Sequence, residues 1–178
     1  MRVETIETER LYLRGFQKED ALFAIGIWND PEMGEYLPDE AMVEIDEAYL
    51  KEIEKLAEDE VCCYMIAEFK DTHERIGTCS FIPSEGGKIY DIAYCVHKNY
   101  WGNGYATEMA GGMVNYAKEH GAYKVTVRVN KDNAASNAVV RKIGFKVIGE
   151  KYYKKRGTEL EFTDYLYELN FRIDKPAN

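Results

Sequence analysis

A glycine-rich turn between a predicted strand and a predicted helix is the feature that most constrains this chain. The turn reads Trp101-Gly102-Asn103-Gly104-Tyr105-Ala106. Residues 89–96 before it form an apolar run typical of a strand, and apolar residues after it recur at helical spacing until Gly121 ends the helix. Apolar and polar residues then alternate strictly over 124–129. This pattern predicts a strand–helix–strand unit within an α/β protein.

The other apolar patterns complete a mixed α/β domain. They predict strands at 10–16, 61–69, 75–82, 145–153 and 162–171, and helices at 17–28, 45–56 and 135–143. With the unit above, this gives a sheet of seven strands with four helices in the order β-α-α-β-β-β-α-β-α-β-β. Because no linker or repeat divides the sequence, we expect residues 1–178 to form a single domain.

Composition excludes several classes of protein. With 46% hydrophobic and 31% charged residues, the chain has material for a core but no apolar run long enough to span a membrane. The N-terminal residues lack the apolar segment of a secretory signal, and the net charge of −9 argues against nucleic acid as a partner. Without CxxC spacing, the cysteines read as buried free thiols of a cytoplasmic protein rather than as a zinc site: Cys62, Cys63, Cys79 and Cys95.

The negative charge is concentrated in one stretch of the chain. Residues 32–60 hold twelve acids and two bases, a local charge of −10, so the rest of the chain is nearly neutral. A solvated helix face is the simplest explanation of such a run. A binding surface for a cationic partner is the alternative.

Three functions compete for the glycine-rich turn. A nucleotide P-loop is excluded because no Lys-Ser or Lys-Thr pair follows the glycines. A dinucleotide fingerprint fits poorly, since Thr107 occupies its third glycine position and no suitable acid follows the next strand before Asp132. A helix N-terminus that binds a pyrophosphate remains, because its free N–H groups and the helix dipole favour an anion. An ordinary tight turn is the alternative.

Longer segments resemble a known family. The segments IAYCVHKNYWGNGYATEM and VNKDNAASNAVVRKIGF are similar to the acetyl-CoA-binding core of the GNAT superfamily of N-acetyltransferases. TERLYLR, WNDPEM and the Trp of YWGNGYATE resemble the branch that acetylates ribosomal-protein N-termini. The resemblance runs from about Thr8 to Leu169. It implies acetyl-CoA as co-substrate and a GNAT fold in which the fourth and fifth strands splay apart.

The resemblance also implies a binding site for acetyl-CoA. Residues 92–96 would bond the pantetheine arm through their backbone, and the turn would hold the pyrophosphate. Trp101 departs from the Gln or Arg usual at its position, which leaves one polar phosphate contact unassigned. Asn133 and Ser136 match the family's NxxS pair, and Asn133 would also cap the helix that follows. The implied binding residues are Val96, Trp101, Gly102, Asn103, Gly104, Tyr105, Ala106, Thr107, Asn133 and Ser136.

Two catalytic roles follow from the same resemblance. Asp91 aligns with a fourth-strand glutamate that serves some members as general base, acting here through water. The alternative is a structural residue that pairs with Lys88 or Lys124. The Cys95 N–H would stabilise the thioester oxygen as it gains charge. We interpret the Cys95 thiol as a packing group, so direct transfer is expected rather than an acyl-enzyme.

The proton donor for the departing thiolate has no obvious candidate. Many members carry a tyrosine at the position of Val140. Ser136 is our preferred substitute, with Tyr152 or Tyr153 of the next strand as alternatives.

We therefore expect a cytoplasmic acetyl-CoA-dependent N-acetyltransferase that acts on a primary amine. A protein N-terminus, ribosomal or other, is one candidate acceptor, and a polyamine or aminoglycoside-type small molecule is another. A catalytically silent acyl-CoA sensor is an alternative of a different class. Family members build the acceptor cleft from the first two helices, where the acidic run lies, so a cationic acceptor is expected.

Overall fold

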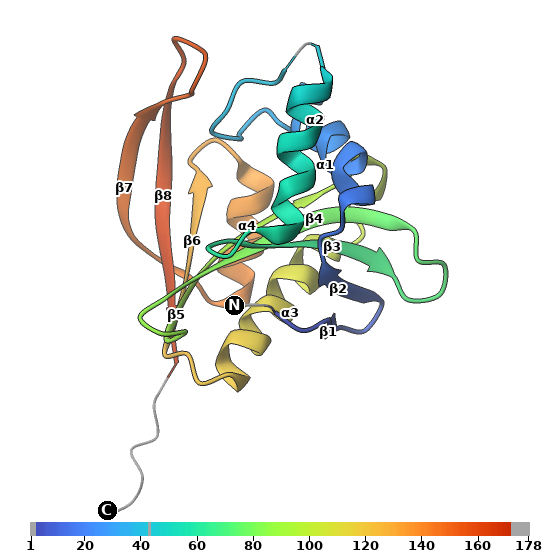
Figure 1. Cartoon of the computed structure of the whole chain (residues 1–178). Coiled ribbons are helices and arrows are strands. Elements are labelled where there is room, and N and C mark those ends of the chain that lie inside the picture. The colour runs from blue at the N-terminus through green and yellow to red at the C-terminus, as the bar shows by residue number, and fades with distance from the viewer. Residues whose placement is uncertain (1–2, 43, 172–178) are drawn as a thin grey trace, which may run out of the picture.

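A computed structural model describes residues 3–42 and 44–171 of the chain (Figure 1). Its strands form one sheet in the order β1-β2-β3-β4-β5-β6-β8-β7. The strands are β1 (Ile6–Glu7), β2 (Leu11–Gly15), β3 (Cys63–Phe69), β4 (Arg75–Ser84), β5 (Ile89–Val96), β6 (Lys124–Asn130), β7 (Lys146–Lys154) and β8 (Glu161–Asn170). The α-helices are α1 (Ala21–Trp28), α2 (Glu47–Glu54), α3 (Tyr105–Glu119) and α4 (Ala134–Ile143), and three short 3₁₀ turns cover Lys18–Asp20, Lys55–Glu58 and Lys98–Tyr100.

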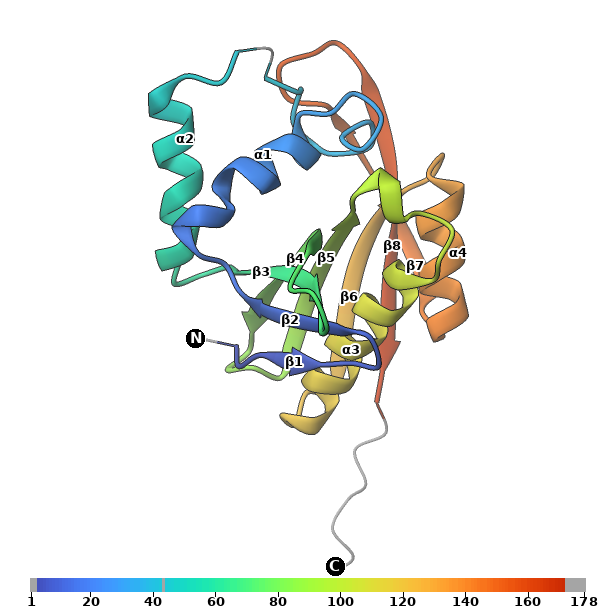
Figure 2. The same cartoon turned by 90° about the vertical axis from the view of Figure 1, so that its right-hand side faces the viewer.

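Helices cover both faces of the sheet (Figure 2). On one face, Met109 and Met113 of α3 pack with Val125 of β6 in the main buried cluster, against which α4 also packs. On the other face, Ala24 of α1 and Ile66 of β3 belong to a second cluster, which α2 helps to cover. The sequence alternation over 124–129 is explained by this arrangement, because the valines of β6 are buried and the residues between them are not.

The sheet divides between β5 and β6. These two strands are parallel and pair only over residues 89–91 and 124–126, whereas every other neighbouring pair is antiparallel. Beyond Asp91 the two strands therefore run on without pairing to each other. The predicted splay of the fourth and fifth strands is confirmed, with β5 and β6 in those places.

Local signals in the sequence fix the helix ends that border this gap. Gly104 precedes α3 with φ 82°, a left-handed conformation that glycine adopts without strain. Asn133 caps α4, since its side-chain oxygen accepts the Ser136 N–H at 3.0 Å. Gly144, with φ 110°, ends α4.

Four details differ from the sequence prediction. The sheet has eight strands because β1, only two residues long, adds an edge strand too short to leave a periodic pattern. The first helix starts at Ala21 after a 3₁₀ turn. Ile45 precedes the helix that it was expected to join, because Asp46 caps α2. Val61 is 73% exposed and lies outside β3.

The four cysteines are free, as predicted. Cys62 and Cys79 are buried, while Cys63 and Cys95 are only half-buried. Within residues 3–42 and 44–171, no helix combines the length and apolar character needed to cross a bilayer. The same residues contain no cluster of His, Cys, Asp and Glu side chains suited to a metal ion.

Candidate active site

The gap between β5 and β6 opens into a groove of about 500 Å³. It brings together four of the predicted site residues, Asp91, Cys95, Asn133 and Ser136, from β5 and the start of α4. Met33, residues 36–38, β6 and β7 also line it. The turn formed by residues 101–107 is not part of this lining.

Backbone groups of β5 face the gap in alternation. The His97 N–H donates to the Ile76 carbonyl of β4 at 2.8 Å, and Cys95 stands opposite Thr78 in the same ladder. Because N–H groups alternate along a strand, the Cys95 N–H also points toward β4, and those of Tyr94 and Val96 point toward the gap. The expected role of the Cys95 N–H as oxyanion donor is therefore wrong. The one-residue error arose because the motif does not fix which amides bond to the neighbouring strand.

Cys95 is half-buried and lines the groove. Burial raises the pKa of its thiol to about 11, so it is protonated at neutral pH. A protonated thiol is a poor nucleophile.

The glycine-rich turn has the form expected of an anion site. Gly102 and Gly104 both have positive φ, 76° and 82°, so the backbone folds sharply before α3. The Asn103 side chain is used within the turn, since its amide donates to the carbonyls of Tyr100 and Trp101 at 3.1 and 2.9 Å. The first N–H groups of α3 have no helical acceptor, which is the property that suits a phosphate.

Two side chains close the turn from either side. The Trp101 indole N–H donates to the Val96 carbonyl at 2.7 Å, which ties the turn to the end of β5. Arg10 lies on the other side, where it donates to the Asn103 carbonyl at 3.1 Å and forms an ion pair with Glu108 at 2.7 Å. Its guanidinium also stacks 4.2 Å from the centre of the Tyr105 ring. The side chains of Trp101 and Tyr105 are thus committed to the fold of the turn.

Ser136 is hydrogen-bonded to a tyrosine that the sequence analysis missed. Its hydroxyl oxygen lies 2.9 Å from that of Tyr94, which reaches across from β5. Burial raises the pKa of Tyr94 to about 12, so the phenol keeps its proton at neutral pH. The aligned position Val140 is fully buried and contributes no polar group. A phenol from the sheet therefore stands near the helix position where the family's tyrosine is absent.

Asp91 lies at the point where β5 and β6 separate. Its carboxylate accepts the Thr126 hydroxyl at 2.7 Å, and burial raises its pKa above the ordinary value for aspartate. The expected alternative of an ion pair with a lysine is wrong, because Lys124 pairs with Glu168 and Lys88 donates to the Gly121 carbonyl.

The two alternative tyrosines are placed very differently. Tyr152 is 74% exposed, and its hydroxyl donates to Glu150. Tyr153 lines the groove, where its hydroxyl donates to Asp164 at 3.2 Å. Burial, aided by the charge of Asp164, raises the pKa of Tyr153 to about 12. Of the two, only Tyr153 borders the site.

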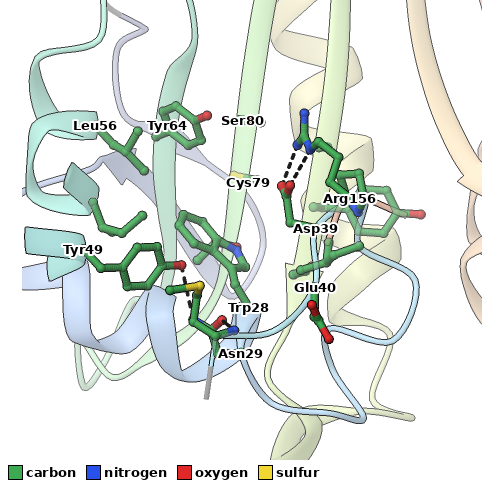
Figure 3. Close-up of a pocket in the computed structure, with 18 of the residues that line it drawn as sticks. Trp28, Asn29, Asp39, Glu40, Tyr49, Leu56, Tyr64, Cys79, Ser80 and Arg156 are labelled. Carbon is green, nitrogen blue, oxygen red and sulfur yellow. Dashed lines mark hydrogen bonds and ion pairs between the residues drawn. The ribbon is translucent and has the colours of Figure 1, made fainter. Parts of the chain in front are cut away.

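A second cavity of about 630 Å³ adjoins the groove on the face covered by α1 and α2. The two cavities share residues 93–95 of β5 as a common wall. Trp28, Tyr49 and Tyr64 line one side of the second cavity, and Figure 3 shows them across from Asp39, Glu40 and Arg156.

Most of the acidic run lies outside the lining of this second cavity. Among residues 32–60, the acids that line it are Asp39 and Glu40. Glu35, Glu44 and the acids of α2 are exposed or lie outside the lining. The expectation that the run lines the acceptor cleft is therefore wrong for most of its residues, since helical spacing does not show which face meets the sheet.

Hydrogen bonds between residues 34–40 and residues 155–156 join two segments at the edge of both cavities, and we call this contact the roof. The hairpin between β7 and β8 meets the segment of residues 34–40, where the Arg156 N–H donates to the Pro38 carbonyl and the Glu40 N–H to the Arg156 carbonyl, at 2.8 and 2.9 Å. The buried Lys155 ammonium donates to the Glu35 carbonyl at 2.9 Å. Pro38 and Arg156 line both cavities.

Comparison with known proteins agrees with this geometry. The family profile described as "Acetyltransferase (GNAT) domain" matches residues 10–146. The chain belongs to the GNAT family. It is an acetyltransferase, and acetyl-CoA is its co-substrate.

Individual GNAT proteins resemble the chain over nearly its whole length. An N-acetyltransferase named p20 from Bacillus licheniformis is 28% identical over 174 residues, which cover 94% of this chain and 96% of p20. Among solved structures, spermidine N-acetyltransferase from Vibrio cholerae has a TM-score of 0.78 at 16% identity, covering 90% of this chain and 95% of that chain. The ribosomal L7/L12 α-N-protein acetyltransferase RimL has a TM-score of 0.76 at 20% identity, covering 95% of each chain.

Several site residues of this GNAT protein left no signal in the sequence. Tyr94 sits inside an apolar strand, where a tyrosine usually packs. Thr126 reads as an ordinary polar residue of an alternating strand. Arg156 and Glu40 come from loops 116 positions apart, and only the fold brings them to one cavity.

Proposed function

We propose that the chain transfers the acetyl group of acetyl-CoA directly to a primary amine, with the thioester in the groove and the amine in the adjoining cavity. The observation that carries this proposal is the common wall of the two cavities at residues 93–95, where the N–H groups of Tyr94 and the neighbouring Val96 face the gap. A donor on one side of this wall and an acceptor on the other can meet without an acyl-enzyme. The protonated Cys95 thiol favours the same conclusion.

The chemical steps follow from the groups at this wall. The amine nitrogen attacks the thioester carbonyl carbon, a C–N bond forms, and the carbonyl oxygen takes the negative charge beside the amides of Tyr94 and Val96. Collapse of this intermediate breaks the C–S bond. The departing thiolate takes a proton from the hydroxyl pair of Ser136 and Tyr94, and Asp91 receives the proton of the attacking amine through water.

Each proposed role has a physical basis in the site. A pKa near 12 keeps Tyr94 protonated until charge develops on sulfur. The raised pKa of Asp91 makes its carboxylate a stronger base than an exposed aspartate. The turn of residues 102–106 offers its free N–H groups to the pyrophosphate. Arg10 supports the turn through the Asn103 carbonyl, and its charge is paired with Glu108.

The acceptor must be identified from this chain's own cavity. Proteins of the same fold act on different amines by name, a spermidine acetyltransferase and a ribosomal-protein acetyltransferase among them. Their identities to this chain are too low to transfer a substrate. A protein N-terminus and a polyamine are therefore both tested.

Release of free CoA tests the proposal. The purified chain is incubated with acetyl-CoA and panels of peptides, polyamines and small amines, and the acetylated amine is identified by mass spectrometry. We expect stoichiometric formation of CoA and acetylated amine with at least one panel. Binding of acetyl-CoA without transfer to any amine would instead favour a silent acyl-CoA sensor.

A further inference from the structure

The second cavity has one aromatic wall and one charged wall, and this division restricts the acceptor. Resting on the proposed acetyl transfer, we propose that the acceptor is a small amphiphilic amine with an aromatic or bulky apolar body and no positive charge besides the amine itself. Its apolar body contacts Trp28, Tyr49 and Tyr64. Its ammonium group is attracted by the Glu40 carboxylate as it enters the cavity.

Hydrogen bonds and a ring contact hold the side chains of the aromatic wall in place. The Trp28 indole N–H donates to the Thr78 hydroxyl at 3.2 Å, and the Tyr49 hydroxyl accepts from the Asn29 side chain at 3.3 Å. The rings of Trp28 and Tyr64 lie 6.4 Å apart at an angle of 59°. Side chains fixed in this way bind an apolar ligand without first being ordered, so little entropy is lost on binding. Aliphatic residues of the loop before α2, of α2 itself and of the 3₁₀ turn after it fill the remainder of this side: Leu37, Met42, Ile53 and Leu56.

The charged wall has a net charge of −1. Its charged residues are Asp39, Glu40 and Arg156. Asp39 and Arg156 neutralise each other through two parallel hydrogen bonds, one of them 2.6 Å between Arg156 Nη2 and Asp39 Oδ2 (Figure 3). Among the ion pairs of the described residues none involves Glu40, so it is the carboxylate available to a ligand.

One available carboxylate suits one ammonium. A polyamine would place further ammonium groups against the aromatic wall, where no lining carboxylate can pair with them. Burying an unpaired charge in apolar surroundings costs binding free energy. The rest of the acidic run lies outside this lining and offers no direct ion pair within it.

The roof limits the size of the acceptor. The hairpin at Arg156 and the segment at Pro38 are joined by hydrogen bonds in both directions, so an extended polypeptide cannot pass between them while these bonds hold. A cavity of about 630 Å³ is instead in the range that holds a drug-sized molecule. A small amine therefore fits within the cavity without breaking these bonds.

The test compares four probe amines on the full chain: tyramine, hexylamine, spermidine and a short peptide with a free N-terminus. Initial rates of CoA release give kcat/KM for each. We expect tyramine to exceed spermidine and the peptide by at least ~10-fold, with hexylamine between them.

Variants connect this preference to the cavity. Glu40→Gln should raise KM for tyramine by ~10-fold, because a hydrogen bond to a charged group is lost. Glu44→Gln makes the same change of charge on an exposed residue outside the cavity and should leave KM unchanged. Tyr49→Leu should raise KM for tyramine more than for hexylamine, since only the aromatic contact is lost.

The outcomes separate this inference from the proposed function. A higher kcat/KM for spermidine or the peptide, or equal KM values in Glu40→Gln and Glu44→Gln, overturns the inference and leaves acetyl transfer standing. No CoA release with any amine overturns the proposed function. Calorimetric binding of tyramine, and its weakening in Glu40→Gln, then decides the binding inference by itself.

Discussion

Replacing the phenol of Tyr94 tests whether its hydroxyl pair with Ser136 takes part in catalysis. Tyr94→Phe keeps the ring and removes one hydrogen bond of 2.9 Å. A structural bond of this kind contributes ~1 kcal/mol to the free energy of unfolding. For a domain of this size the melting temperature should then fall by ~2–4 °C.

The catalytic effect should be larger than the structural one. A hydrogen bond to the developing thiolate is charge-assisted and contributes ~1.5–3 kcal/mol, which corresponds to a loss of kcat of ~10- to 150-fold. The affinity for acetyl-CoA should stay nearly constant, since the bond strengthens only in the transition state. Ser136→Ala should give a similar loss. If the two hydroxyls act in series, the double variant loses little more than the worse single variant.

The assay is CoA release under saturating acetyl-CoA, with calorimetry for affinity and thermal melts for stability. Tyr90→Phe is the matched control, because Tyr90 is a buried tyrosine of the same strand that lines neither cavity. A kcat within twofold of wild type for both Tyr94→Phe and Ser136→Ala would refute the proton-donor role and leave the pair a structural contact.

Other changes probe the base, the turn and the fold. Asp91→Asn should lower kcat/KM most below about pH 8, where an alkylamine acceptor, with a pKa of about 10 as in lysine, is almost fully protonated and needs a base; an equal deficit at every pH in the rate profile would indicate structural damage instead. Gly104→Asp should abolish acetyl-CoA binding in calorimetry, because a side chain is strained at φ 82° and its charge would repel the pyrophosphate; unchanged affinity would argue against this site. Asp20→Asn should lower the unfolding free energy in urea by ~1.5–3 kcal/mol, since the buried Asp20 carboxylate forms charge-assisted hydrogen bonds with the partly exposed Arg14 and Arg75; a loss below about 1 kcal/mol would contradict that account.

The sequence predicted the parts of the fold that depend on local periodicity. The helix after Gly104, the alternating strand at 124–129 and the helix capped by Asn133 all appear where their patterns place them. The two-residue strand at Ile6 was missed because a period of two cannot be recognised in so short a segment. Residues that were wrongly assigned to a strand or helix, such as Val61, lie at the ends of these elements. Hydrophobicity alone does not show whether a side chain there is buried.

The site was predictable only as far as its motifs reach. Asp91, Asn133 and Ser136 were placed in one groove by the resemblance, and the structure gathers them there. The direction of the Cys95 amide depends on the ladder with β4, which no motif encodes. The Tyr94–Ser136 pair joins residues 42 positions apart through the packing of α4 on the sheet. Long-range contacts of this kind follow from the fold and not from spacing.

The short pairing of β5 with β6 has a mechanical consequence. Because three residue pairs join these strands, the sheet consists of two half-sheets with a short seam, and the hydrogen bonds between residues 34–40 and the β7–β8 hairpin form a second link at the open end. Any molecule that bridges the gap adds bonds where the sheet has none. At a concentration of 100 times its Kd, such a molecule adds ~2.7 kcal/mol to the native state. Amide hydrogens along the facing edges of β5 and β6 would then exchange with solvent ~100-fold more slowly. The stability of the native state therefore depends on the concentration of the co-substrate.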